Sequence, residues 1–307
     1  MFAQHEDRAK AIRKCVMAYI KKHSKTDNPA VLLSSGADSH LLLFAALRLG
    51  KRPTVFSCTL AGQESQDFKG ARNTAKLFGL KFVPVILPTD VEHLINYTKL
   101  LYDDRINPGL VVGKATAECT WPVAHALKAI KANGNTEVIT GFGGDTWYCT
   151  LRAQKKLWLK GQYQDVIDKY LVMAQNDNNG TDTGHWGGKD PQQVIRLNWM
   201  ATFTPTIKKF LVPFSDPKLF KVMAGMDPIR DGCRPIQKAP WRLAFWDEFE
   251  KARASVYIHV PMQKGDSGIE EHFHILLQSR LNTKGYKSTI GIYNDQLRLW
   301  RDRHQDD

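Results

Sequence analysis

The sequence contains, at residues 30–40, the stretch Ala30-Val31-Leu32-Leu33-Ser34-Ser35-Gly36-Ala37-Asp38-Ser39-His40, and the apolar run Leu41–Leu49 follows it directly. A short apolar strand that ends in Ser-Ser-Gly and opens into a helical pattern is typical of a turn that binds phosphate, because the N–H groups and the dipole at a helix start attract anions. Gly36 lets the backbone approach the ligand. The hydroxyls of Ser34, Ser35 and Ser39 can donate to phosphate oxygens. The plainer alternative is an ordinary strand, turn and helix with a serine-rich turn.

Asp38 is unexpected in a site for anions alone, because a carboxylate beside polyphosphate is repelled unless a cation lies between them. We therefore expect Mg²⁺ to be held jointly by Asp38 and phosphate oxygens, which are ligands that this ion prefers. The stretch lacks the Gly-Lys-Ser/Thr ending of a Walker-type loop, which excludes that class of nucleotide site.

Strand and helix patterns alternate along the first half of the chain. Strands are predicted at 30–33, 54–59, 81–87 and 136–140, and helices at 6–22, 41–49, 67–78, 90–103 and 120–131. Short connections between alternating elements predict an α/β fold, a parallel twisted sheet with helices on both faces. Ligands of such sheets bind beyond the carboxyl ends of the strands, so we expect Ser57–Leu60 to lie on the same rim as Ser34–Ser39.

A second glycine-rich turn follows the strand predicted at 136–140, and it reads Gly141-Phe142-Gly143-Gly144-Asp145. Two such turns at the carboxyl ends of two strands would place Asp38 and Asp145 on either side of one polyphosphate, where they would share its cations. A matched pair of turns in one sheet is stronger support for a nucleotide site than either turn alone.

Helical patterns dominate from Leu151 onward, and no further alternation of strands and helices is clear. Helices are predicted at 155–175, 218–224, 241–254, 269–282 and 288–302, with a polar loop at 176–190. We expect residues 1–150 to form the nucleotide-binding core, and residues 151–307 to form a mainly helical region that completes the active site.

The composition is that of a globular protein, with 43% hydrophobic and 24% charged residues among 307. No stretch approaches the length of a membrane span and the start has no apolar signal region, so we expect a cytoplasmic protein without membrane contact. The five cysteines are scattered and never form a C-x-x-C pair, which argues against a disulfide framework and a zinc site. The net charge of +12 is compatible with a nucleic-acid partner, an anionic substrate or a solvated basic surface.

Four motifs occur in an order that resembles the synthetase domain of asparagine synthetase and its relative β-lactam synthetase. Ser34–Ser39 (SSGADS) is similar to the SGGxDS motif of the PP-loop ATP pyrophosphatases, and Gly141–Asp145 (GFGGD) is similar to the family's SGEGSDE-type loop. Val212–Asp216 (VPFSD) resembles its R-x-PFLD segment, and Met262–Gly268 (MQKGDSG) resembles its K-x-x-x-S-x-G loop. The resemblance runs from about residue 30 to about residue 275 and implies an adenine nucleotide alpha hydrolase-like fold that uses ATP and Mg²⁺.

The resemblance also implies roles for single residues. Asp38 and Asp145 would hold Mg²⁺, and Lys264 would reach the phosphates and the transition state, where its ammonium can offset developing negative charge. Adenine would be received by the backbone around Ser57, Cys58 and Leu60. The remaining phosphate contacts would come from the two loops, with Ser34, Ser35, Gly36, Ala37 and Ser39 in the first and Gly141, Phe142, Gly143 and Gly144 in the second.

The chain departs from the family pattern at several positions. Phe2 stands where asparagine synthetase has a nucleophilic cysteine, so we expect no glutamine hydrolysis by this chain. Phe142 replaces a residue that serves the second half-reaction in both relatives, and phenylalanine cannot take a proton. Glu118 lies about where asparagine synthetase has an arginine, which makes Glu118 a candidate for meeting an amino group; Ser267 is a further substrate candidate.

The resemblance implies an ATP-dependent, adenylate-forming ligase that makes an amide or other C–N bond and releases AMP and pyrophosphate. The acceptor would be a small-molecule carboxylate or amide. The nitrogen would come from ammonia, from a separate glutaminase or from an amine on the substrate. Two alternatives stand beside this prediction: a PP-loop enzyme that modifies nucleic acid or a nucleobase, favoured by the positive charge, and a catalytically inactive nucleotide-binding homologue, favoured by Phe142.

Overall fold

The structure is a computed structural model that describes residues 3–90, 93, 114–141, 144, 159–162, 209–223, 237–257, 267–269 and 271–272, with only the backbone at 3–4, 114–120, 209, 215, 217 and 220. Its centre is a parallel sheet of five strands in the order β3-β2-β1-β4-β5. The strands are β1 (Ala30–Leu32), β2 (Thr54–Leu60), β3 (Phe82–Leu87), β4 (Glu137–Ile139) and β5 (Lys209–Leu211). The predicted α/β fold with a parallel sheet is confirmed.

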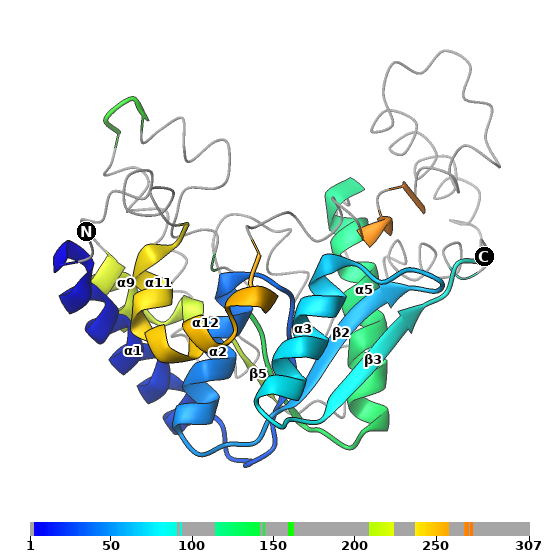
Figure 1. Cartoon of the computed structure of the whole chain (residues 1–307), viewed down its shortest axis with the longest axis horizontal. Coiled ribbons are helices and arrows are strands. Elements are labelled where there is room, and N and C mark those ends of the chain that lie inside the picture. The colour runs from blue at the N-terminus through cyan, green and yellow to red at the C-terminus, as the bar shows by residue number, and fades with distance from the viewer. Residues whose placement is uncertain are drawn as a thin grey trace, which may run out of the picture.

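Helices cover both faces of this sheet (Figure 1). On one face lie α2 (Ala37–Arg48) and α3 (Gln66–Leu77), while α5 (Lys114–Ala132) packs on the opposite face against β2 and β3. A second layer on the first face packs over α2, and it consists of α1 (Ala3–His23), α11 (Ala239–Ala244) and α12 (Trp246–Lys251), with α9 (Pro217–Met223) beside α1.

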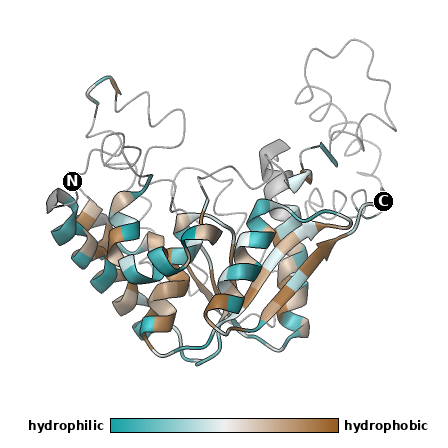
Figure 2. Ribbon diagram, in the orientation of Figure 1, coloured by the Kyte–Doolittle hydropathy of each residue, from teal (hydrophilic) through white to brown (hydrophobic). Residues whose placement is uncertain are grey.

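The hydrophobic pattern explains this layering. α1 alternates hydrophilic and hydrophobic residues along its length (Figure 2), and its Ile12, Val16 and Ile20 are buried while Lys14 and Lys21 are exposed. The first residues of β1 and the stretch 41–46 of α2 are apolar and almost fully buried, because both are covered by other elements. Among the described residues, no helix is long and apolar enough to cross a membrane.

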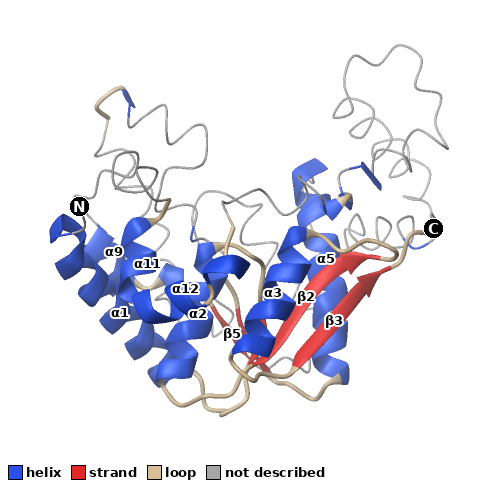
Figure 3. Ribbon diagram, in the orientation of Figure 1, coloured by secondary structure: helices blue, strands red, loops and turns tan. Residues whose placement is uncertain are grey.

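The strand order creates a switch point between β1 and β4. The chain proceeds outward from β1 to β2 and β3, and then returns through α5 to β4 on the other side of β1. The loops that leave β1 and β4 therefore diverge, and a crevice opens between them at the carboxyl ends of the strands. The arrowheads of β2 and β3 in Figure 3 point toward this edge of the sheet.

Two expectations for the second half of the chain were wrong. β5 was not predicted, although it pairs in parallel with β4, because its three residues carry too short an apolar pattern to recognise. The single helix expected at 241–254 is divided into α11, α12 and the 3-10 helix η3 (Arg253–Ser255), with a break at Phe245, whose φ of −137° is not helical.

Several other predicted elements fall outside the described residues. They are the helices at 155–175, 269–282 and 288–302 and the loop at 176–190, apart from a few single positions, and most of the helix at 90–103. The division of the chain at residue 150 stays a prediction. The pairing of β5 with β4 does show that the sheet draws a strand from each side of that boundary.

Candidate functional site

A cavity of about 290 Å³ lies at the switch point, beyond the carboxyl ends of β1, β2 and β4. It is bounded by the loop between β1 and α2, the start of α3, one side of α5, the residues after β4 and the segment at 267–269. Its lining residues are Leu32, Leu33, Ser34, Ser35, Gly36, Asp38, Ser39, Phe56, Ser57, Cys58, Ser65, Asp67, Pro122, Val123, Ala126, Thr140, Gly141, Ser267 and Ile269.

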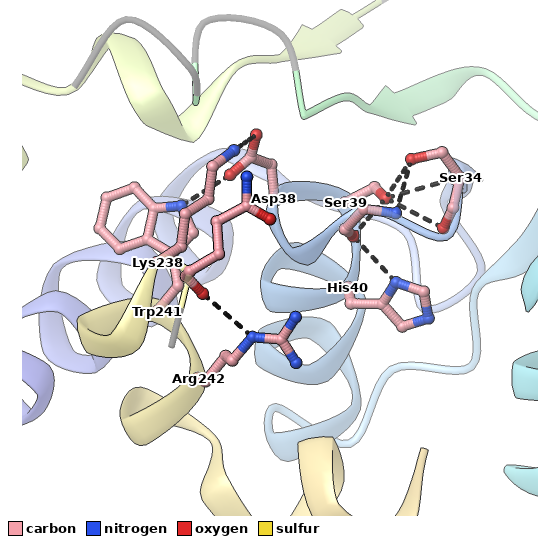
Figure 4. Close-up of polar contacts among 9 residues, drawn as sticks. Ser34, Asp38, Ser39, His40, Lys238, Trp241 and Arg242 are labelled. Carbon is pink, nitrogen blue, oxygen red and sulfur yellow. Dashed lines mark hydrogen bonds and ion pairs between the residues drawn. The ribbon is translucent and has the colours of Figure 1, made fainter. Parts of the chain in front are cut away.

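The serine-rich loop after β1 is shaped by its own hydroxyls (Figure 4). Ser34 N and Gly36 N donate to the hydroxyls of Ser39 (3.2 Å) and Ser34 (3.1 Å), respectively, and the two hydroxyls lie 3.1 Å apart. Gly36 is the N-cap of α2, and among the described residues no side-chain cap bond forms there. Gly36, Asp38 and Ser39 at this helix start all line the cavity, and N–H groups at the start of a helix can bind an anion.

Ser35, a predicted phosphate contact, forms hydrogen bonds within the protein. Its N–H and its hydroxyl both donate to Asp67 Oδ1, at 2.9 and 2.5 Å. Its carbonyl accepts from Tyr257 N at 3.1 Å. Ser35 lines the cavity, but its polar groups tie the loop to α3 and to the segment after η3 rather than presenting a donor to phosphate.

His40 braces the same loop from inside the protein. It is fully buried, with Nδ1 3.0 Å from Gly36 O and Nε2 2.9 Å from Thr74 Oγ1. Because a carbonyl oxygen only accepts, Nδ1 carries the proton and Nε2 accepts from the Thr74 hydroxyl. Burial lowers the pKa of His40 to about 4, so the ring is neutral near neutral pH.

Asp38, at the first turn of α2, has a cation beside it, and that cation is a lysine. Lys238 Nζ lies 2.5 Å from Asp38 Oδ2, and Trp241 Nε1 donates to Asp38 Oδ1 at 2.7 Å. Figure 4 shows both side chains reaching Asp38 from α11. The Lys238 side chain is 2% exposed and that of Asp38 is 14% exposed. The carboxylate therefore lies between a buried basic group on one side and the cavity on the other.

The second glycine-rich turn meets the first one. A Cβ atom added to Gly144 would lie 2.5 Å from Asp38 Cγ, and one added to Gly141 would lie 3.2 Å from Ser39 N. Gly144 N also donates to Gly141 O at 3.3 Å, which folds the turn back on itself. Glycine is required here because any side chain at 144 would overlap the Asp38 carboxylate.

The side of the cavity near β2 is largely apolar. Pro122, Val123 and Ala126 of α5 face β2, and Cys58 Sγ donates to Pro122 O at 3.2 Å. Burial raises the pKa of the Cys58 thiol to about 12, so it is a neutral, unreactive part of the wall. This surface suits a flat heteroaromatic ring better than an ion.

The segment at 267–272 closes the cavity beyond β2. Ser267 and Ile269 line the cavity, and Gly268 has a φ of +69° and packs on Leu60 and Gln63. His272, the last described residue of this segment, stacks on Trp121 of α5 with ring centroids 5.7 Å apart.

The structure gathers most of the predicted site residues that it describes. The residues that line the cavity are Ser34, Ser35, Gly36, Asp38, Ser39, Ser57, Cys58, Gly141 and Ser267, whereas Ala37, Leu60 and Gly144 are not among its described lining residues. Phe142, Gly143, Asp145 and Lys264 lie outside the described residues, and of Glu118 only the backbone, within α5, is described.

Sequence reasoning missed other residues of the site. Asp67 follows the N-cap Ser65 of α3 and looked like an ordinary first-turn acid. Lys238 and Trp241 carried no signal, because they lie 200 and 203 positions from their partner Asp38. A tryptophan in a helical pattern is usually read as core, and Trp241 is indeed fully buried.

The donor set fits a hard cation that shares its coordination with phosphate. Among the described residues, no three His, Cys, Asp or Glu side chains come close enough to hold a metal by themselves. Asp38 offers a carboxylate at the cavity between the two glycine-rich turns, and Mg²⁺ typically takes one or two protein carboxylates, with substrate phosphates and water completing its shell.

A family model supplies an independent comparison. Residues 11–204, more than half of the chain, match the model described as asparagine synthase. The match includes both glycine-rich turns and β1 to β4. No curated protein matches the chain.

Proposed function

The chain belongs to the asparagine synthase family, and from that premise we propose that it activates a carboxylate or amide oxygen with ATP and then forms a C–N bond. Membership places it with ATP-dependent amide ligases. In the proposed reaction the substrate oxygen attacks the α-phosphorus of ATP, pyrophosphate leaves, and a nitrogen nucleophile then displaces AMP from the adenylate.

One observation carries the proposal: the turns after β1 and β4 meet at Asp38, beside a cavity with a polar and an apolar side. The polar side is formed by Ser34–Ser39 at the start of α2, and it suits the phosphates. The apolar side, between β2 and α5, suits adenine. This arrangement supports a nucleotide that lies across the switch point, with its phosphates between the two turns.

Positioning and charge do most of the proposed catalytic work. The N–H groups of α2 would orient the phosphates, and the apolar wall beside Cys58 would exclude water from one side of the adenylate. Asp38, with Asp145 as its expected partner, would hold Mg²⁺, which when bound supplies positive charge to the phosphate oxygens. Lys264 is proposed to add a second positive charge from its loop.

The nitrogen donor follows from the residues that depart from the family pattern. Because Phe142 cannot accept a proton, we propose that the nitrogen arrives as free ammonia or as an uncharged amine, or that another side chain serves as base. A small-molecule acceptor is consistent with the cavity of about 290 Å³, which is at the small end of the range for ligand sites.

Exchange of labelled pyrophosphate into ATP tests the proposal directly. Purified protein is incubated with Mg²⁺–ATP, labelled pyrophosphate and a panel of carboxylates and amides. Exchange that depends on one class of acceptor supports the ligase. ATP binding without exchange across the panel would favour an inactive homologue. Binding to tRNA that collapses with added salt, accompanied by tRNA-dependent exchange, would favour the nucleic-acid-modifying alternative.

A further inference from the structure

Asp38 is contacted from the side away from the cavity by two residues of one short segment. Lys238 Nζ and Trp241 Nε1 lie 2.5 and 2.7 Å from the two oxygens of the carboxylate. Asp38 lines the cavity, whereas neither Lys238 nor Trp241 is among the described residues that do. The two contacts therefore fix both oxygens from behind.

The backbone at Lys238 is held in a conformation that a lysine rarely adopts. Its φ of 55° and ψ of 43° are left-handed, and it is the one non-glycine residue with a positive φ in the described part of the chain. Such a conformation costs free energy and persists only where the surrounding structure compensates for it. Lys238 is the N-cap of α11, and its carbonyl accepts a hydrogen bond from Trp241 N at 3.0 Å. The strained residue therefore also fixes the backbone position of Trp241 in the first turn of the helix.

Trp241 is fixed independently by packing. Its ring stacks on Phe214 with centroids 5.4 Å apart and an angle of 24° between the planes. Phe214 belongs to the 3-10 helix η2 (Pro213–Ser215), which follows β5 at the carboxyl end of the sheet. Both side chains are fully buried. The indole N–H is therefore aimed at Asp38 by a rigid support that extends from the sheet.

We propose that Lys238 and Trp241 are positioning residues, which hold the Asp38 carboxylate in the orientation that binds the cation of Mg²⁺–ATP. The proposal rests on the function proposed above. A carboxylate has about four sites for hydrogen bonds or metal contacts, so two donors behind Asp38 are compatible with a metal in front of it. Lys238 acts through Asp38 and not on the nucleotide, because its side chain is only 2% exposed and is engaged by that carboxylate.

The test is a double-mutant cycle on nucleotide affinity. The dissociation constant of Mg²⁺–ATP is measured by calorimetry for the wild type, Lys238→Met, Asp38→Ala and the double variant, at a temperature where circular dichroism shows all four folded. We expect Lys238→Met to weaken binding by about tenfold in the wild-type background, and by less than about twofold once Asp38 is alanine, because residues that act through one another are not additive.

Trp241→Phe extends the test without altering charge. It keeps an aromatic ring on Phe214 and removes the N–H donor to Asp38. We expect a loss of affinity of about threefold to tenfold, the scale of one hydrogen bond, which again disappears in the Asp38→Ala background. If Lys238→Met does not fold, the double-mutant cycle is measured with Trp241→Phe and Asp38→Ala alone.

Two controls separate positioning from general stability. Lys51→Met removes another buried lysine, which donates to backbone carbonyls and not to Asp38, and Trp246→Phe alters a tryptophan that is 40% exposed. Both are expected to leave the affinity for Mg²⁺–ATP unchanged.

Three results would overturn the inference. Effects of Lys238→Met and Asp38→Ala that multiply would show that Lys238 contacts the nucleotide by itself. A lower melting temperature with unchanged affinity in Lys238→Met and Trp241→Phe would show a purely structural role. A wild-type protein that binds no Mg²⁺–ATP would contradict the proposed function as well, whereas the first two results leave that function intact.

Discussion

Two buried lysines lie near opposite ends of the parallel sheet, and their partners differ in kind. Lys51, 9% exposed, precedes β2 at its amino end and donates to Thr26 O at 2.6 Å. Glu137, 7% exposed, begins β4 at the same end and accepts from Ser24 Oγ at 2.8 Å and Lys25 N at 2.9 Å. At the carboxyl end, Lys238 pairs directly with the carboxylate of Asp38.

We propose that this difference separates a structural network from the nucleotide site. The hydrogen bonds of Lys51 and Glu137 at the amino end go largely to the turn after α1. These bonds hold one loop in place and satisfy both charged groups without a ligand. The carboxylate at the other end faces a cavity and is touched by a second glycine-rich turn. Buried charge is unfavourable at both ends, and we propose that only at the carboxyl end does a bound cation offset this penalty.

Asp38→Ala should have the largest effect. We expect turnover to fall at least about hundredfold, the scale of losing one preorganised charge-stabilising group, and we expect the same of Asp145→Ala. The measurement is the rate of pyrophosphate exchange at saturating ATP, with circular dichroism as the control for folding. Full activity in either variant would contradict the proposal that the carboxylates at the carboxyl end of the sheet are functional and those at the amino end structural.

Glu137→Gln should affect stability and not function. The substitution weakens the acceptor of the Ser24 hydroxyl and the Lys25 N–H, and we expect it to lower the free energy of unfolding by about 2 kcal/mol. Urea denaturation gives the stability, and calorimetry should give an unchanged affinity for Mg²⁺–ATP. A large loss of affinity in a folded Glu137→Gln protein would contradict the assignment of this network to structure alone.

Gly144→Ala places a methyl group against the Asp38 carboxylate, which we propose binds the cation. The added Cβ would lie 2.5 Å from Asp38 Cγ, so either Asp38 or the turn must move. We expect a loss of pyrophosphate exchange of about tenfold, because even a displacement of about 1 Å in an active site can lower the rate by up to about a hundredfold. Gly134→Ala is a useful control, because nothing lies within 4 Å of its added Cβ although its φ of +83° strains the backbone; it should cost stability and leave exchange intact.

The smallest effect is expected for His40. This residue is intermediate between the two ends, because it is buried behind the loop after β1 but is not among the described residues that line the cavity. Its pKa is lowered to about 4 by burial, so between pH 6.5 and pH 4 the unfolded chain binds the proton and the folded one does not. Stability should therefore fall as the pH is lowered, by about 1 kcal/mol between pH 7 and pH 5.5. Urea denaturation at both pH values should show this decrease in the wild type.

The matched variant for that measurement is His40→Gln, which has no titrating ring. Its decrease over the same interval should be smaller by about 1 kcal/mol. Equal decreases in the two proteins would show that His40 is not the group that titrates.

The sequence predicted the sheet well where its strands are buried apolar runs. Val31, Phe56 and Val138 lie in such runs. The glycines in the turns that follow these strands can be recognised as turn residues from the neighbouring sequence alone. β5 was not predicted because a strand of three residues is too short to show an alternating pattern of apolar and polar positions. The contacts of Lys238 and Trp241 with Asp38 could not be predicted for a different reason. A contact between positions 38 and 238 depends on the whole topology, so no local pattern in the sequence indicates it.

The roles of the serines show the same limit. A serine-rich turn predicts an anion site, but which hydroxyls would face the ligand depends on neighbours that the turn does not contain. Ser35 bonds to Asp67 of α3, and Ser34 bonds to Ser39 within the loop. The N–H groups at the start of α2 are consequently the donors that we propose for phosphate.

The most direct test of this account is a crystal structure with Mn²⁺ and an ATP analogue that cannot be cleaved between its α- and β-phosphates. We predict adenine between β2 and α5, phosphates between the turns at 34–39 and 141–144, and an anomalous Mn²⁺ peak at about 2.1 Å from an Asp38 oxygen. A nucleotide bound anywhere else, or a metal that does not touch Asp38, would contradict the central claim that these two turns form one triphosphate site.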